Sequence, residues 1–155
     1  MKISTKGRYG LRAVLDIALH DDGETPVSLT EIAERQYVSV NYLEQLMTKL
    51  KKANIVKGVR GAQGGYHMAR PADEISVGEV LRALEGSLEP VDCAEIMTDG
   101  IPCEGAKACV TKFVWKRIGD AINDAVDHLM LSDLVDEGKS LINNEKAVAG
   151  NCVRG

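Results

Sequence analysis

Aromatic residues and long apolar runs are both scarce in this chain of 155 residues. Aromatic side chains make up 4%, with one Trp and one Phe, which disfavours an aromatic-packed β sandwich and favours helices rich in Leu, Val, Ile and Ala. No apolar run approaches the roughly 20 residues that span a bilayer, and the first residues lack the apolar core of a signal peptide. We therefore expect a cytoplasmic, mainly α protein with no membrane partner.

Charged residues and cysteines are unevenly distributed. Residues 1–70 carry 11 Lys and Arg against 7 Asp and Glu, whereas the rest of the chain carries 8 against 16. This asymmetry indicates a first half that faces a polyanion and a second half that faces solvent or a partner. The chain has only four cysteines. In a reducing compartment, they are better explained as ligands, reactive thiols or core residues than as disulfides.

The first half has the residue spacing of amphipathic helices. Apolar residues recur at three- and four-residue steps after a cap at Ser4 or Thr5 and stop before Asp21, which predicts a first helix. The pattern of a capping box at 28–31 predicts a short helix from Leu29 to Arg35. Ser39 is a cap for a third helix soon afterwards, and two helices joined by so short a turn are typical of a helix-turn-helix motif.

A β-hairpin is predicted directly after these helices. The β-prone segments 55–60 and 66–69 flank residues 61–65, which include three glycines that permit a tight, positive-φ tip. A further capping box at Ser76 predicts a short closing helix. The elements together predict a winged helix-turn-helix domain, with the hairpin as a small wing, over residues 1–85.

Polar residues suited to DNA contact lie on the predicted recognition helix, at the hairpin tip and on the first helix. In a winged helix, the second helix of the pair enters the major groove and the hairpin reaches phosphates or the minor groove. Asn and Gln can pair with adenine, Glu can accept from cytosine, and Lys and Arg hold phosphates. We predict DNA contacts by Arg8, Asn41, Tyr42, Glu44, Gln45, Lys49 and Arg60. The alternative is a solvated basic face on a winged fold that binds protein.

Motifs of common enzyme classes are missing from the chain. The glycine-rich tip has neither the Lys-Ser/Thr of a P-loop nor the order G-x-G-x-x-G, and neither G-x-S-x-G nor H-E-x-x-H occurs. A thiol enzyme needs only a cysteine and a histidine distant in sequence, so the missing motifs do not exclude this class of enzyme. We predict that the protein is not an enzyme.

Three cysteines gather in one stretch that lacks helical periodicity. Residues 86–110 contain Cys93, Cys103 and Cys109 together with two prolines, which predicts a long functional loop. Thiolates converging from such a loop suit a soft metal centre. The spacing alone leaves open zinc with a fourth ligand and a redox pair with a resolving cysteine.

A strong apolar stripe follows the cysteines. It predicts one helix over residues 111–131, about 31 Å long at 1.5 Å per residue, which is longer than a small winged domain needs. An exposed apolar stripe requires a partner helix, so we expect a homodimer through this helix. A short terminal helix is predicted to end at residue 143, and residues 144–155 are predicted to be a disordered tail.

Three stretches resemble the iron-sulfur cluster regulator (IscR-type) family of winged-helix transcription factors. They are Ile-Ser-Thr-Lys-Gly-Arg-Tyr at 3–9, Tyr-Leu-Glu-Gln-Leu at 42–46 and Val-Arg-Gly-Ala-Gln-Gly-Gly-Tyr at 59–66, and the similarity extends over about residues 1–140. The resemblance implies a winged-helix dimer built on a long helix, with a 2Fe-2S cluster held by the three cysteines of the preceding loop. It also implies that Glu44, Gln45 and Arg60 occupy DNA-reading positions.

Two features depart from this family. The first gap between cysteines is longer than in its best-known members, and Lys112 stands where they place a histidine ligand. A protonated lysine has no lone pair for a metal, so the fourth ligand is unassigned. The candidates are Asp92, Glu104, Cys152 or a group of the other subunit, whereas His20, His67 and His128 are expected to have no part in the site.

The resemblance implies a homodimeric repressor of iron-sulfur cluster assembly genes that receives its cluster from the iron-sulfur assembly machinery. Three alternatives stay open. The first is a winged-helix regulator that senses zinc or thiol redox state, the second a related regulator of cysteine metabolism, and the third a structural zinc protein that binds other proteins.

Overall fold

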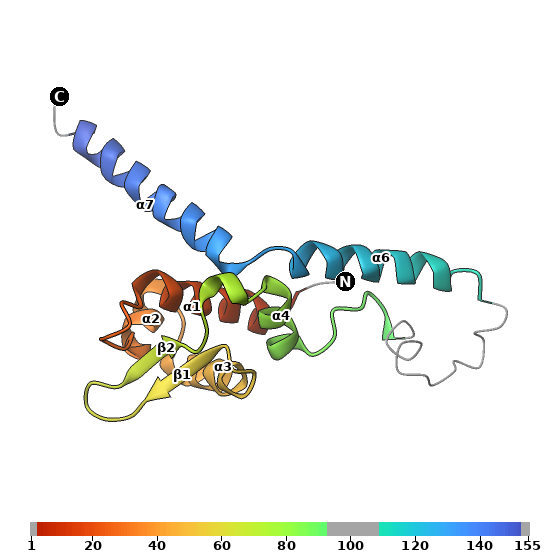
Figure 1. Cartoon of the computed structure of the whole chain (residues 1–155), viewed down its shortest axis with the longest axis horizontal. Helices are drawn as coiled ribbons and strands as arrows, with labels where there is room; N and C mark the ends of the chain where they lie inside the picture. The colour runs from red at the N-terminus through yellow and green to blue at the C-terminus, as the bar shows by residue number, and fades with distance from the viewer. Residues whose placement is uncertain (1–2, 93–108, 153–155) are drawn as a thin grey trace.

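The structure is a computed structural model that describes residues 3–92 and 109–152, with side chains as far as Glu145. The described part is mainly helical with one β-hairpin, which confirms the predicted fold class. Figure 1 shows that residues 3–85 form one body, called the head, and that α6 and α7 leave it in different directions. In chain order the elements are α1 (Thr5–His20), α2 (Leu29–Gln36), α3 (Val40–Lys52), β1 (Val56–Val59), β2 (Gly65–Met68), the 3-10 turn η1 (Ala72–Glu74), α4 (Val77–Glu85), α6 (Lys112–Asp127) and α7 (Leu131–Cys152).

The core lies inside the head, where the predicted apolar stripes meet. Helix α1 contributes Val14 and Ile17, which are fully buried. Helix α3 contributes four residues, and α4 closes the core from the other side with Val80, Leu81 and Leu84. The apolar spacing therefore placed these three helices correctly, because each presents one stripe inward and a polar face outward. The four residues of α3 are Leu43, Leu46, Met47 and Leu50.

In the head, three of the four predicted helix caps are present. The side chain of Ser4 accepts from the N–H of Lys6, and that of Ser39 accepts from the N–H of Tyr42. The capping box at Ser76 is complete, since its hydroxyl and the carboxylate of Glu79 exchange hydrogen bonds with each other's backbone N–H. The box predicted at Ser28 is wrong, because its side chain makes no cap hydrogen bond.

The start of α2 is held by strand-like pairing instead. Val27 and Tyr66 exchange two backbone hydrogen bonds of 2.9 Å, which attaches the chain before α2 to β2. A Cβ at Gly65 would collide with the carbonyl of Val27, so this approach requires glycine. β1 pairs with β2 in antiparallel register, with Val56 opposite Met68 and Val59 opposite Gly65. The wing is therefore tied to the helix-turn-helix motif at its base.

The prediction of one long helix over residues 111–131 is wrong at the C-terminal end of that helix. Helix α6 ends at Asp127, and residues 128–130 turn back to the head. The N–H of Val77 donates to the carbonyl of Leu129 at 2.8 Å, and the N–H of Leu131 donates to the carbonyl of Ile75 at 2.9 Å. Leu131 is thereby fully buried. Apolar spacing continued across this break, because Leu129 and Met130 are also apolar.

The terminal region also differs from the prediction. Helix α7 runs from Leu131 to Cys152, well beyond the predicted end at residue 143 and into the predicted tail. Leu131 and Val135 are buried, which anchors the first turns on the head. None of the described helices is long and apolar enough to cross a membrane.

Candidate nucleic-acid interface and cysteine site

Helix α3 exposes the polar residues that the sequence predicts for base contact. Because its apolar residues face the core, Asn41, Glu44 and Gln45 lie on the opposite, exposed face. All three lie in the first two turns, which is the part of a recognition helix that contacts base edges. This face offers an amide pair and a carboxylate to the outside of the head.

Tyr42 lies beside that face and packs against α1. Its ring meets the ring of Tyr9 edge-on, with centroids 6.3 Å apart, and its hydroxyl donates to Thr5 Oγ1 at 3.3 Å. The guanidinium of Arg8 lies 5.8 Å from the centroid of Tyr9. These contacts bring the predicted phosphate contact Arg8 next to the start of α3. Tyr42 thus has a packing role within the head.

Arg60 lies at the hairpin tip and is exposed. Gly61 follows with φ +119°, and the N–H of Gly64 donates to the carbonyl of Gly61 at 3.0 Å, which closes the tip. A Cβ at Gly64 would collide with the carbonyl of Val59, so the tip is narrow and bare around the arginine. Figure 1 shows the hairpin and α3 on the same side of the head, away from α6 and α7.

Glu44 and Tyr66 connect α3 to the wing electrostatically. Burial raises the pKa of Tyr66 above its ordinary value, and the nearby carboxylate of Glu44 raises it further. Lys51 lies at the same base, since its Nζ would be 3.7 Å from a Cβ at Gly58. Tyr66 therefore lies between the wing, Val27 and Glu44, a position that was not predicted. The available signal was a tyrosine in a short strand next to glycines.

Lys49 is bonded within the head. Its Nζ donates to the carbonyl of Leu84 in the last turn of α4 at 2.9 Å. Such a bond satisfies one of the carbonyls that a helix end leaves without a partner. An ammonium group has three protons, and the bond to Leu84 uses one of them. The phosphate contact predicted for Lys49 therefore stays a prediction.

Cys109 is the cysteine whose side chain the structure describes, and it immediately precedes α6. The hydroxyl of Thr111 and the backbone N–H of Lys112 hydrogen bond to its sulfur and lower the pKa of the thiol. The distance from Sγ to Thr111 Oγ1 is 3.2 Å. These contacts favour the thiolate, the form that binds metals.

The remaining members of the predicted cysteine site fall outside the described residues. Cys93, Cys103 and the candidate ligand Glu104 lie in the segment 93–108, and the side chain of Cys152 is not described. Within 3–92 and 109–145, no group of three or more His, Cys, Asp or Glu side chains is placed to hold a metal. The cluster ligands therefore stay a prediction.

The three histidines are engaged elsewhere. His20 Nδ1 lies 2.8 Å from the carbonyl of Asp16, and His67 Nδ1 lies 2.7 Å from a carboxylate oxygen of Asp21. His128 is at the far end of α6 from Cys109, where the backbone and carboxylate of Asp124 raise its pKa. That the histidines take no part in the cysteine site stays a prediction.

The residues before the cysteine segment pack against α6. Arg82 of α4 forms a bidentate ion pair with Asp127 of α6, with contacts of 2.7 Å. Farther along, Glu89 accepts from Asn123 Nδ2 at 3.3 Å and lies directly against Gly119. The chain into the segment is therefore attached to the helix that follows the segment.

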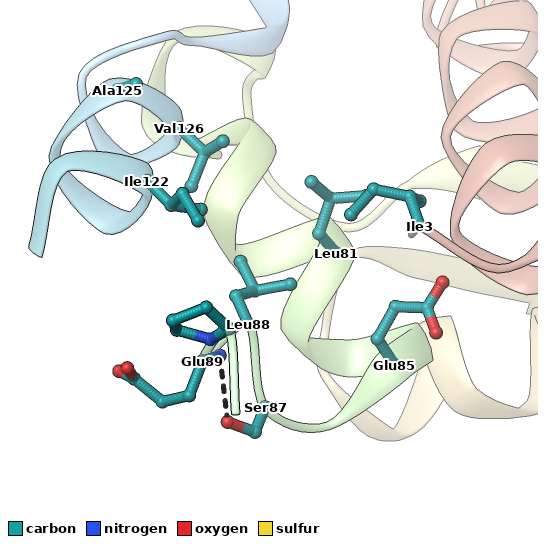
Figure 2. Close-up of a pocket in the computed structure, with 10 residues that line it drawn as sticks. Ile3, Leu81, Glu85, Ser87, Leu88, Glu89, Ile122, Ala125 and Val126 are labelled. Carbon is teal, nitrogen blue, oxygen red and sulfur yellow. Dashed lines mark hydrogen bonds between the residues drawn. The ribbon is translucent and has the colours of Figure 1, made fainter. Parts of the chain in front are cut away.

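A cavity of about 490 Å³ lies where these parts meet. Figure 2 shows Leu81 and Leu88 on one side of it and Ile122 and Val126 on the other. The lining is mainly apolar. The cavity separates the end of α4 from the second half of α6, so these elements are not packed together everywhere.

Helix α6 has a second apolar face that points away from the head. Residues 114, 118 and 121 are exposed, whereas Gly119 is buried and Ile122 and Val126 pack against the core. Val114 is 52% exposed and Phe113 is 67% exposed. The apolar stripe of the sequence is therefore two adjacent stripes. Ile122 lies on the one that faces its own head.

Comparison with known proteins places this architecture in one family. The Rrf2 family, described as an iron-dependent transcriptional regulator, matches residues 3–137. The transcriptional regulator IscR of Erwinia tasmaniensis is 39% identical over 142 residues, which are 92% of this chain and 83% of that protein. IscR of Pectobacterium carotovorum is 40% identical over 141 residues, which are 91% of this chain and 83% of that protein.

Solved structures agree. CymR, the global cysteine regulator of B. subtilis, is 41% identical with a TM-score of 0.71, covering 88% of this chain and 98% of that one. The IscR of T. potens is 44% identical with a TM-score of 0.69, covering 89% of this chain and 88% of that one. These relatives are regulators of transcription, which confirms the predictions of a DNA-binding, non-enzymatic protein and of the IscR-type resemblance. The chain belongs to the Rrf2 family of iron-dependent transcriptional regulators.

Proposed function

We propose that the protein is a homodimeric repressor that reads DNA with α3 and the hairpin and senses iron-sulfur status through a cluster held by its cysteines. The observation that carries the DNA part is the exposed face of Asn41, Glu44 and Gln45 on the same side of the head as the hairpin of Arg60. Arg8, close to Tyr42, adds a phosphate contact from α1. Glu44 selects partly by rejection, because a carboxylate repels groups that cannot donate to it.

The proposed cofactor is a 2Fe-2S cluster bound by Cys93, Cys103 and Cys109. Support comes from Cys109, whose side chain is half-buried and whose pKa is lowered by Thr111 and by the backbone N–H of Lys112. A thiolate is the donor that iron in such clusters takes. When bound, the cluster would link the three cysteines through its irons, and Cys109 would join it to the start of α6. Three cysteines without a histidine at 112 leave the fourth ligand of the cluster to another group. An incomplete set of strong ligands makes the cluster labile, which suits a protein that senses the supply of clusters.

Dimerisation is proposed through the outward stripe of α6. Its exposed apolar residues are spaced four and three apart, as in helices that pack against a partner helix. A dimer would present two heads to DNA half-sites about 34 Å apart. The state of the cysteine segment would change the spacing of the heads, provided that the cluster binds one arrangement more tightly than the other.

A second candidate function is regulation of cysteine metabolism. It is favoured by the structural likeness to CymR, the global cysteine regulator, with a TM-score of 0.71. The same DNA surface serves both functions, and they differ in the signal. Iron and sulfide analysis of anaerobically purified protein separates them, since the second function needs no cluster.

The DNA surface is tested with Arg60→Ala. We expect weaker binding by about 1–3 kcal/mol, a less steep salt dependence and an unchanged melting temperature, because the tip is exposed and makes no core contact. The control is Lys139→Ala, which removes an exposed positive charge from α7, away from the hairpin. Equal binding by the Arg60 variant and the wild type would show that the hairpin does not contact DNA.

The cluster is tested with Cys109→Ser. Anaerobic reconstitution of the wild type should yield an iron chromophore with the Mössbauer spectrum of a 2Fe-2S centre, and the variant should not hold it. DNA affinity should differ between cluster-loaded and cluster-free wild type. Tight stoichiometric zinc without an iron chromophore would instead support the zinc alternative.

A further inference from the structure

The C-terminal end of α4 is bonded to both helices that carry predicted DNA contacts. Lys49 of α3 donates to the carbonyl of Leu84 at 2.9 Å. One carboxylate oxygen of Glu85 accepts three hydrogen bonds from the start of α1, namely from the N–H and hydroxyl of Ser4 and from the N–H of Gly7, at 2.7–3.0 Å. A carboxylate at a helix N-terminus is favoured by the helix dipole as well. Two adjacent residues thus connect α4 to α3 and to α1.

The backbone of α1 is shaped to receive this end of α4. A Cβ at Gly7 would lie 2.5 Å from Glu85 Oε1, and a Cβ at Gly10 would collide with the side chain of Leu84. Both glycines are buried. Any side chain at these positions would displace the residues that make the two connections. The end of α4 therefore cannot shift without moving its contacts on α1 and α3.

The chain beyond Glu85 leads to the cysteine segment, and its residues 87–90 line the cavity. Leu88 is 7% exposed, and Ser87 Oγ accepts from the N–H of Glu89 at 3.1 Å, as Figure 2 shows. Glu89 is attached to α6 through Asn123. The cavity of about 490 Å³ leaves room beside residues 87–90 for a second arrangement of this stretch.

We propose that Lys49 and Glu85 are positioning residues that couple the segment leading to the cysteines to the DNA-reading helices. Lys49 then acts on DNA binding mainly through α4 and not as a phosphate contact. This inference rests on the proposed DNA-binding function. Coupling between two sites is reciprocal. If a change in residues 86–92 alters α3, DNA bound to α3 must also alter residues 86–92.

The test measures amide hydrogen exchange with and without DNA, using a duplex enriched from a random-sequence library by the wild-type protein. In the wild type, DNA should slow exchange in α3 and also in residues 84–92, although these lie outside the proposed DNA surface. In Lys49→Met the slowing at 84–92 should be lost while that in α3 persists. Lys49→Arg, which can still donate to the Leu84 carbonyl, should restore it.

The salt dependence of binding separates positioning from phosphate contact. Lys49→Met should bind roughly fivefold more weakly, with the slope against salt unchanged. The matched control is Lys52→Met, an exposed lysine at the end of the same helix, which should retain the slowed exchange at 84–92. A slope reduced by about one in Lys49→Met would mark a phosphate contact and overturn the positioning role.

The two failures are distinguishable. If DNA slows no exchange in α3 of the wild type, the proposed function is wrong and the coupling falls with it. If α3 responds but residues 84–92 do not, or respond equally in Lys49→Met, the coupling alone is wrong. Thermal unfolding of each variant verifies that the head is folded.

Discussion

The head and α6 are built from similar apolar spacing but bury it to very different extents. In the head, α3 alone buries four apolar residues in a core shared with α1 and α4. In α6, the one buried residue among those described is Gly119, and its outward residues stay exposed. A helix on the head is stabilised by its own chain, whereas the outward apolar face of α6 has no partner among the described residues. The difference predicts that the head and α6 respond differently to the same kind of substitution.

The largest effect is expected in the head. Leu50 is fully buried at the end of α3, so Leu50→Ala should lower the free energy of unfolding by about 2–5 kcal/mol through lost burial and a cavity. Denaturant titration followed by circular dichroism measures it. The matched control is Leu141→Ala on α7, where the side chain is 65% exposed and the change should stay within about 0.5 kcal/mol. Similar losses for both variants would contradict the contrast between core and projecting helix.

The joint between the head and α6 should come next. A Cβ at Gly78 would collide with the carboxylate of Asp127, which is paired with Arg82. Gly78→Ala should therefore cost about 2 kcal/mol despite the higher helix propensity of alanine. The control Gly138→Ala has nothing closer than Leu19 at 3.4 Å and should be neutral or slightly stabilising. A stabilised Gly78 variant would mean that α6 is not held to the head by this ion pair.

Substitutions on the two apolar stripes of α6 should have different effects, and the change in free energy should be smaller than at Gly78. Ile118→Glu places a charge on the outward stripe and should weaken dimerisation at least tenfold, about 1.4 kcal/mol, without changing the melting of the head. Analytical ultracentrifugation across a concentration series measures the dissociation constant. Ile122→Glu should instead destabilise the head, because Ile122 packs against its core. Dimers of unchanged affinity in the Ile118 variant would remove the outward stripe from the interface.

The smallest effect concerns the acid stability of the head. Burial alone would raise the pKa of Asp21, but hydrogen bonds from His67 and from the N–H groups of Met68 and Gly23 outweigh it and hold the pKa below its usual value. A depressed folded pKa contributes stability above the unfolded pKa of about 3.9, and this contribution is lost as pH falls through the folded pKa.

Asp21→Asn should therefore cost about 1 kcal/mol at neutral pH and flatten the loss of stability below about pH 4. Unfolding free energies measured over an acid pH series test this. Asp73→Asn, an exposed residue of η1, is the control and should leave the profile unchanged. A variant profile parallel to that of the wild type would exclude Asp21 as the source.

The candidate site shows how far local patterns reach. The exposed positions of Asn41, Glu44 and Gln45 followed from α3 alone, because the apolar residues of a helix determine which face is left for solvent. The bond between Lys49 and the Leu84 carbonyl joins residues 35 positions apart, and no local pattern indicates it. Glycine at 7 and 10 was a visible signal of close approach, but its partner, the end of α4, was not.

By itself, the sequence determined the helices of the head, three of their caps, the hairpin and the family resemblance, because these depend on residues close together in the chain. Only the tertiary structure decided where α6 ends, since the backbone of Leu129 and Leu131 pairs with residues more than 50 positions earlier. It also divided one apolar stripe into a face for the head and a face left exposed. Apolar periodicity specifies that a face is buried, whereas the identity of its partner depends on long-range packing.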